Sequence, residues 1–278
     1  MTRAAVINIA LALLVGGLAL FLYFRPEPGV APELVLSTLD PDRVTRVRVE
    51  RGESITALEK RAGSWYLAEP YPARADAFRT RQLLDLLNAK ASRKLPATDL
   101  ARFDLDHPAV RIVFDDQPIA FGTVNEMSNE QYVQAGDGVY LIPLRHAAAV
   151  PQDAKALTGR QLFAADEELV EITVGPVTMT QQDGRWRLTP EAADLSRDDL
   201  NRWGDDWKGA ASLLTQKRDA KKSGDAVTVK LKNGKTVRLP VLQTEPELIL
   251  AREDEGLQYH FSAAAGKRLL TVPSAASK

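Results

Sequence analysis

The sequence contains no cysteine and only three histidines among its 278 residues. The absence of cysteine excludes disulfides, reactive thiols, thiolate metal ligands and an anchor built on a lipid-modified cysteine. Stability must therefore come from packing, for which a chain of this length is large enough. No long basic run is present, and 36 lysines and arginines balance 37 aspartates and glutamates. A nucleic acid partner is accordingly not expected.

One long apolar run does occur, at the N-terminus. Residues 4–24 carry no charge and have about the 20-residue length that a helix needs to cross a bilayer. We expect residues 1–25 to form a transmembrane anchor and the proline-containing residues 26–43 to form an extended stalk. A signal peptide cleaved near Ala31 is the alternative. Because the N-terminal stub is short, we expect a single-pass protein whose stub stays on the inner side and whose soluble region lies on the far side of the membrane.

After the stalk, the same order of signals occurs twice. Residues 63–67 and 184–188 share the pattern Gly-x-Trp-x-Leu, which places Trp65 and Trp186 at matching positions. Strands that alternate apolar and polar side chains precede each pattern. A helix follows each one, predicted over residues 76–91 in the first copy and from an N-cap at Ser196 in the second.

Further strand pairs follow each predicted helix in matching order. Residues 109–114 turn at Asp115-Asp116, and residues 226–231 turn at Asn233-Gly234, a pair that favours a two-residue hairpin turn. A last strand pair closes each copy and contains Tyr140 or Tyr259. Corresponding landmarks are about 120 residues apart throughout, which indicates an internal duplication.

We therefore predict an α+β fold with two tandem similar domains, each a mainly antiparallel sheet covered by one main helix. The expected boundaries are 44–149 for the first repeat, 150–168 for a linker, 169–273 for the second repeat and 274–278 for a disordered tail.

The repeats make two specific structural predictions. Residues 44–146 and 169–264 should superpose, with Trp65 and Trp186 equivalent and buried to a comparable extent. Within the linker, Leu157, Leu162 and Phe163 should pack at the junction.

Residue types that often carry chemistry are present, but not in catalytic patterns. His107, His146 and His260 are isolated from one another and from any second ligand at a metal-binding spacing. The acidic pairs are adjacent in sequence, whereas a glycosidase needs two carboxylates that face each other across a cleft. We interpret Asp115-Asp116 as turn residues, Asp198-Asp199 as helix N-terminal residues and Asp205-Asp206 as a solvated helix face. We predict no catalytic, cofactor-binding or metal-binding residue, and no cofactor.

Two other groups invite a binding interpretation. Trp203 and Trp207 are one helical turn apart, so we assign both to the core rather than to a sugar-stacking surface. A basic cluster follows the second helix and is interpreted as a solvated connection near a helix C-terminus; it comprises Lys217, Arg218, Lys221 and Lys222.

Part of the sequence also resembles a known family. The pattern runs from Val44 to Leu141 and comprises Trp65 with Pro70, a helix, Asp99-Leu100-x-x-Phe103-x-Leu105-x-x-Pro108, then Tyr132-Val133 and Val139-Tyr140. It resembles an uncharacterised bacterial, membrane-anchored domain-of-unknown-function family found beside gliding-motility-type ABC transporter components. Residues 157–163 resemble the junction before the second half of that family. Asp104 departs from the pattern, where the family usually has glycine.

The resemblance implies a non-enzymatic accessory or scaffold subunit of the cell envelope, associated with an ABC-type transport system in the inner membrane. It also implies the location: inner membrane, single-pass, with the soluble region in the periplasm. Its expected partner is an ABC transporter permease or another envelope protein. The alternative is a membrane-anchored envelope module that binds glycan or lipid through exposed aromatic side chains at Tyr66, Tyr71 and Tyr140.

Overall fold

The computed structural model describes residues 3–24, 34–191, 195–219 and 224–272, with the side chains of residues 3–10, 22 and 23 excepted. The chain divides into two compact units, residues 1–34 and residues 35–278. The first contains the helix α1 (Arg3–Phe24). Predictions about Ala31, residues 26–33 of the stalk, Lys221, Lys222 and the tail at 274–278 fall outside the described residues.

The membrane predictions are corrected. Among the described residues, no helix is long and apolar enough to cross a membrane. This finding contradicts both the predicted transmembrane anchor and the predicted single-pass inner-membrane location.

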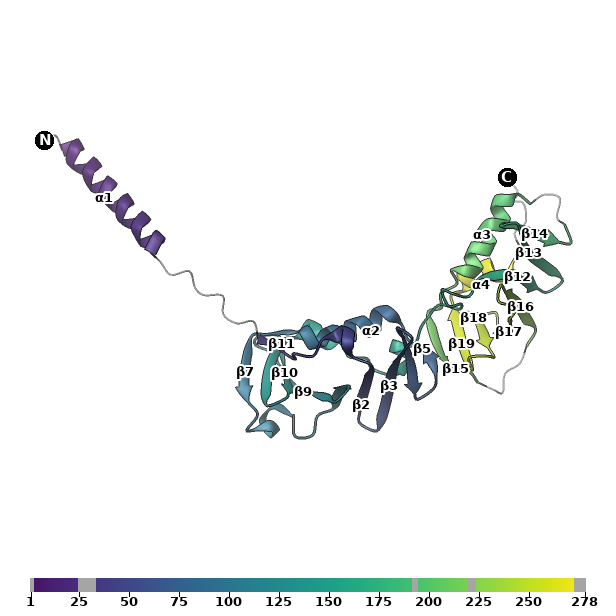
Figure 1. Ribbon diagram of the computed structural model, residues 1–278, viewed down its shortest axis with the longest axis horizontal. Helices are drawn as coiled ribbons and strands as arrows, with labels where there is room; N and C mark the ends of the chain where they lie inside the picture. The colour runs from purple at the N-terminus through teal and green to yellow at the C-terminus, as the bar shows by residue number, and fades with distance from the viewer. Residues whose placement is uncertain (1–2, 25–33, 192–194, 220–223, 273–278) are drawn as a thin grey trace. The chain divides into compact units, whose positions relative to one another are not determined.

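Antiparallel β-sheet is the main regular structure of the second unit, coloured by position along the chain in Figure 1. The larger sheet has nine strands, in the spatial order β5 (Ala73–Arg74), β4 (Ser64–Glu69), β3 (Ser54–Arg61), β2 (Arg46–Arg51), β8 (Val110–Phe114), β9 (Gln117–Asn125), β10 (Glu130–Ala135), β11 (Gly138–Pro143) and β7 (Arg93–Pro96). A separate two-stranded sheet pairs β1 (Leu34–Val35) with β6 (Lys90–Ala91).

The other large sheet has eight strands. Their spatial order is β14 (Arg185–Thr189), β13 (Val177–Gln182), β12 (Leu169–Val174), β16 (Ala226–Leu231), β17 (Thr236–Gln243), β18 (Leu248–Arg252), β19 (Leu257–Phe261) and β15 (Leu214–Lys217). If β5 is set aside, both sheets have the same order: a three-strand meander, then a four-strand meander, then the strand that links the two along the chain. Trp65 and Trp186 are the second residues of the equivalent strands β4 and β14, and each is partly buried.

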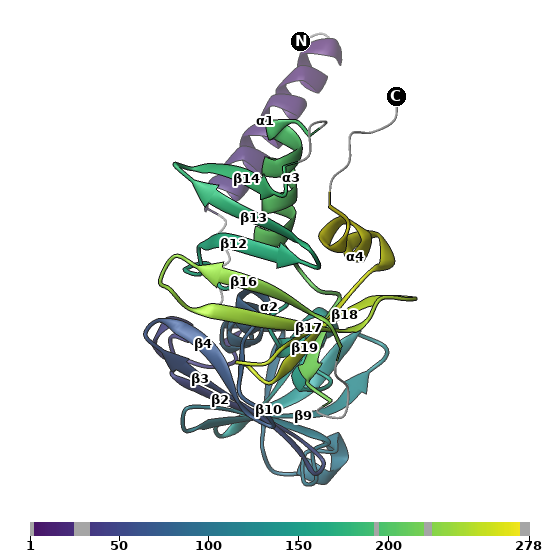
Figure 2. The ribbon, with the colours of Figure 1, turned by 90° about the vertical axis from the view of Figure 1, so that its right-hand side faces the viewer.

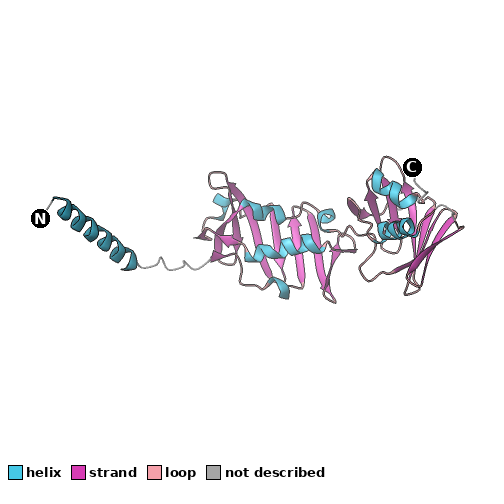
Figure 3. Cartoon of the chain, turned by 90° about the horizontal axis from the view of Figure 1, so that it is seen from above, coloured by secondary structure: helices cyan, strands magenta, loops and turns pink. Residues whose placement is uncertain are grey.

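Short helices lie against the sheets, as the view from above shows (Figure 3). They are α2 (Ala77–Leu84), α3 (Arg197–Lys208) and α4 (Ala263–Leu270), together with short 3-10 helices at Pro41–Arg43, Asp85–Asn88, Leu100–Phe103, Leu144–Ala149 and Ala154–Leu157. The predicted α+β class is therefore wrong: strands dominate, and the helices are small. The helix expected over residues 76–91 ends at Leu84, because the chain tightens into a 3-10 turn and then enters β6.

One continuous hydrophobic core extends through both sheets. Leu157, Leu162 and Phe163 of the connecting segment are buried in it, and their exposures are 1%, 0% and 4%. A connection that contributes side chains to the same core holds the two sheets together, so the segment 157–163 is part of the folded frame.

Candidate binding cleft

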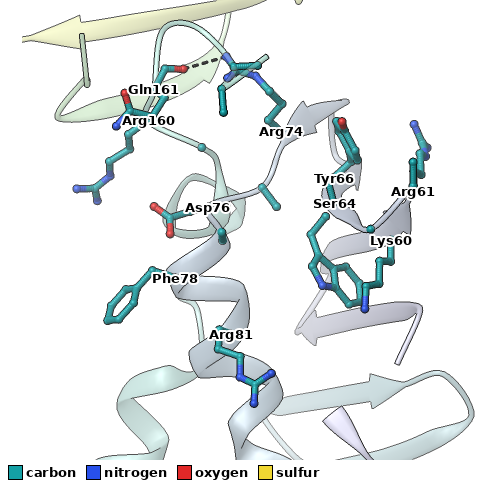
Figure 4. Close-up of a pocket in the computed structure, with 18 of the residues that line it drawn as sticks. Lys60, Arg61, Ser64, Tyr66, Arg74, Asp76, Phe78, Arg81, Arg160 and Gln161 are labelled. Carbon is teal, nitrogen blue, oxygen red and sulfur yellow. Dashed lines mark hydrogen bonds between the residues drawn. The ribbon is translucent and has the colours of Figure 1, made fainter. Parts of the chain in front are cut away.

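A cleft with a volume of about 990 Å³ lies beside α2 (Figure 4). Its walls come from the β3–β4 hairpin, the start of α2 and the connecting segment 159–166. The close-up shows Lys60, Arg61 and Tyr66 on the strand side, Phe78 and Arg81 on the helix, and Arg160 on the connecting segment. The cleft thus combines cationic and aromatic side chains from three separate elements.

The strand wall is shaped by a tight turn. Ala62 and Gly63 have φ angles of 48° and 85°, which lets β3 reverse directly into β4. This turn pairs Lys60 with Trp65 across the hairpin. The guanidinium of Arg61 then lies 5.8 Å from the ring centroid of Tyr66, a cation–π distance, and also hydrogen-bonds Glu59.

The helix wall is fixed at its first turn. The Asp76 side chain accepts a hydrogen bond from the Arg79 N–H at 2.9 Å and so caps α2. Arg81 pairs with Asp42 at 2.5 Å and with Asp85 at 2.9 Å. Phe78 is 68% exposed on the same helix. An apolar ring is therefore presented to solvent beside an anchored arginine.

The connecting segment is held tightly against β5. The Gly159 N–H donates to the Arg74 carbonyl at 2.7 Å, and a Cβ on Gly159 would lie only 3.0 Å from that oxygen. In return the Arg74 guanidinium donates to the carbonyls of Gln161 at 2.9 Å and Leu162 at 3.2 Å. This close approach favours glycine and fixes the wall that carries Arg160.

Arg74 also ties the first sheet to the second. Its guanidinium pairs with Glu255 at 3.1 Å and donates to the Tyr259 hydroxyl at 3.1 Å. Burial raises the pKa of Tyr259, and the nearby Glu255 carboxylate raises it further, so this phenol stays protonated and donates to Glu255. The floor of the cleft is therefore braced by residues from both sheets.

Behind this floor lies a buried arginine that sequence reasoning missed. The Arg252 side chain is 1% exposed and pairs with Glu167 and, at 3.1 Å, with Asp254. It also donates to the Leu162 carbonyl at 2.6 Å and lies 5.5 Å from the Phe163 ring centroid. Burial raises the pKa of both Glu167 and Asp254, but hydrogen bonds from Arg252 and other donors more than offset this and hold each pKa below its ordinary value.

The three histidines lie on separate parts of the fold. Among the described residues, no group of three or more His, Cys, Asp or Glu side chains could hold a metal ion. Burial, and then the Arg145 charge, lowers the pKa of His146. His260 is 8% exposed; its Nδ1 lies 2.9 Å from Glu247, and its Nε2 lies 2.9 Å from the Gln258 amide. His107 lies in the loop before β8.

The acidic pairs lie at turns and helix ends. Asp115 has a φ of 49° and accepts hydrogen bonds from the N–H groups of Thr45 and Arg46 at 3.1 and 2.9 Å. Asp199 forms a capping box with Ser196 at the start of α3. Further along α3, Asp206 lies 3.6 Å from Arg268 of α4. None of the three lines the cleft.

The aromatic predictions have mixed outcomes. Trp203 and Trp207 are 2% and 0% exposed, so their assignment to the core is confirmed. Tyr140 is only 9% exposed, which contradicts its proposed role as an exposed binding aromatic. Tyr71 is half-buried and contacts the Thr158 hydroxyl at 3.2 Å. Of the three predicted tyrosines, Tyr66 alone lines the cleft.

Within the basic cluster, Arg218 pairs with Glu253 at 3.0 Å. Lys217 is the last residue of β15, an element that the sequence did not reveal. The cluster therefore begins on a sheet edge rather than in a helix-terminal connection.

Comparisons with known proteins give one result. The domain of unknown function DUF4340 matches residues 65–244, more than half of the chain and spanning from β4 to β17. No curated protein matches the chain. No solved structure matches it. The chain belongs to the DUF4340 family.

Proposed function

We propose that this protein is a non-enzymatic binding and scaffold subunit that acts with an ABC-type transport system. The observation that carries the proposal is the braced cleft of about 990 Å³, in which exposed cationic and aromatic side chains stand on a rigid frame. Aromatic and arginine side chains are enriched at the centres of protein interfaces. The association with transport rests on the sequence resemblance.

The partner surface would be centred on Phe78 and Arg160. Phe78 is 68% exposed. Arg160 is exposed, and its guanidinium has no hydrogen-bond or ion-pair partner among the described residues, although its carbonyl accepts from Ser212. An apolar ring beside an unpaired cation favours a protein partner with an apolar contact and an acidic neighbour. Such a partner would dock without any chemistry supplied by this chain.

Site-specific photocrosslinking tests this proposal in cells. A photoreactive phenylalanine analogue at position 78 of the full chain should crosslink to an ABC permease or ATPase. The matched control carries the analogue at Met127, which is 99% exposed at the tip between β9 and β10. Crosslinks to transport components only from position 78 support the proposal. Their absence from position 78, or equal crosslinking from both positions, refutes it.

A second candidate is a module that binds an anionic glycan or lipid headgroup. It is favoured by Tyr66 and Trp65, which line the same cleft as Lys60 and Arg160. Aromatic faces stack on sugars and cations bind anionic groups. Sedimentation of the purified protein with peptidoglycan and with anionic liposomes would decide, because no retention on either removes this candidate.

A further inference from the structure

The strand β14 is the outermost strand of the second sheet, as Figure 2 shows. It pairs with β13 on one side, from Thr178 opposite Thr189 to Gln182 opposite Arg185. On its other side, no strand pairs with it among the described residues. An outermost strand leaves alternate backbone N–H and C=O groups open to pairing with another chain.

The first sheet covers the equivalent position with its own chain. There β5 pairs antiparallel with β4, placing Arg74 opposite Tyr66 and Ala73 opposite Leu67. The Ala75 N–H adds a hydrogen bond to the Trp65 carbonyl at 3.0 Å. The two sheets otherwise share one strand order, so β5 shows how an extended segment fits beside this strand of the fold.

A cleft of about 560 Å³ lies along β14, between this strand and the first half of α3. Trp186 and Leu188 alternate with exposed arginines along the strand. Leu195 and Leu200 add apolar surface from the helix side. A groove between an edge strand and a helix is a common site for an extended peptide that adds to a sheet.

The charge of this cleft favours an acidic occupant. Its cations are Arg185, Arg187 and Arg197, and none has an ion-pair partner in the described part of the chain. Its acids are Glu191 and Asp198, so cations are in excess. On a pleated strand, Arg185 and Arg187 project on the same face and are spaced to meet alternate side chains of a paired strand.

We propose that β14 binds an acidic, extended peptide segment of a partner protein as an added antiparallel strand. Backbone hydrogen bonds to the open edge of β14 would supply affinity, and the arginines would select acidic side chains. This inference concerns a different surface from the cleft beside α2 and does not rest on the transport proposal.

The test measures binding of a fluorescein-labelled peptide of alternating glutamate and valine, about six residues long, the usual length of a strand. Fluorescence anisotropy with the full chain should give saturable binding that weakens as salt is added. The Arg187→Glu variant should bind at least about tenfold more weakly, a loss of about 1.4 kcal/mol. The matched control is Arg111→Glu, which reverses an exposed arginine on the interior strand β8 and should leave the affinity unchanged.

Two control peptides separate strand addition from simple charge attraction. A lysine–valine peptide should not bind, and a glutamate–valine peptide with alternate backbone nitrogens methylated should bind at least about tenfold more weakly, because it cannot donate to β14. Hydrogen exchange should show new protection in residues 185–189. Lack of binding at about 1 mM, equal binding of either control peptide, or full binding by Arg187→Glu would overturn the proposal.

Discussion

Trp186 of β14 lies directly against Gly204 of α3: a Cβ on Gly204 would overlap the indole nitrogen and lie 2.8 Å from Cε2 of the same ring. The helix and the strand therefore meet through a glycine and a tryptophan. We expect Gly204→Val to displace the ring and destabilise the protein by about 1–3 kcal/mol. Urea unfolding measures this, and Asn201→Val, at an exposed position of the same helix, is the control. A loss no larger than that of the control would show that Trp186 does not pack there.

The two equivalent tryptophans should contribute similarly to stability. Trp65 and Trp186 are both partly buried, whereas Trp207 is 0% exposed. Trp207→Ala should therefore cost about 3–5 kcal/mol, the range for a buried aromatic residue. Trp65→Ala and Trp186→Ala should each lower the free energy of unfolding by less than Trp207→Ala does, and the two losses should be similar to one another. Guanidinium unfolding of the three variants checks the order, and a Trp65 or Trp186 loss above that of Trp207 would contradict it.

Removing Arg252 should be strongly destabilising. Arg252→Met leaves Glu167 and Asp254 without their buried cation, and breaking a buried pair in this way typically costs about 3–5 kcal/mol. Arg238→Met is the control, because its side chain is 59% exposed and its pair with Glu253 should contribute less than about 1 kcal/mol. Thermal and urea unfolding compare the two variants, and equal losses would contradict a central role for Arg252.

The same carboxylates predict how stability depends on pH. The pKa of Glu167 lies below its ordinary value of 4.5, and the pKa of Asp254 lies below 3.8. A carboxyl group whose pKa is lower in the folded state adds stability above its unfolded pKa and loses it as the pH falls through its folded pKa. The free energy of unfolding should therefore decrease as the pH falls below about 4.5.

The Arg252→Met variant isolates this contribution. Without the cation, burial should raise both carboxyl pKa values, so the stability difference from the unmodified protein should be largest near neutral pH and shrink towards about pH 4. Urea titrations across this range measure the difference. A gap that stays constant with pH would show that the lowered pKa values do not come from Arg252.

Local signals predicted much of the strand framework. The Asp115-Asp116 turn does join β8 to β9, with Asp115 at a φ of 49°. Asn233-Gly234 does lie in the turn between β16 and β17, but the predicted two-residue turn is wrong: the strands end at Leu231 and start at Thr236, and only Gly234 of the pair has a positive φ, at 86°. These turns were readable because positive φ restricts the residues that can occupy them. Ser196 does cap α3, since its side chain and that of Asp199 satisfy each other's backbone N–H groups.

Elements defined by distant partners were not readable. β7 (Arg93–Pro96) and β15 (Leu214–Lys217) lack clear apolar alternation and exist as strands because each pairs with the end of a meander that comes later in the chain. The helix expected up to residue 91 was overridden when Lys90 and Ala91 entered a strand. α4 was missed, although Ser262 caps it.

The two clefts also depend on contacts that no local pattern encodes. Arg252 can be buried only because the Leu162 carbonyl and the Glu167 carboxylate of the connecting segment pair with it. Nothing in the sequence of its own strand therefore indicated that this arginine is buried. Arg74 lies in a two-residue strand, and the groups that its guanidinium contacts, the Gln161 carbonyl and the Tyr259 hydroxyl, are more than 80 positions away in the chain. The Gly-x-Trp-x-Leu pattern marked the strands that border both clefts, but not the helix and linker walls that complete them.

The most direct test of the proposed transport role is quantitative affinity purification of the full chain from its native cells after mild solubilisation. The account predicts that an ABC permease and its ATPase are recovered with the unmodified protein, that Arg160→Glu sharply lowers their recovery, and that Arg111→Glu does not. Both substitutions reverse an exposed arginine, but only Arg160 lines the cleft beside α2. Recovery of neither component with the unmodified protein, or equal recovery with Arg160→Glu, would contradict the account.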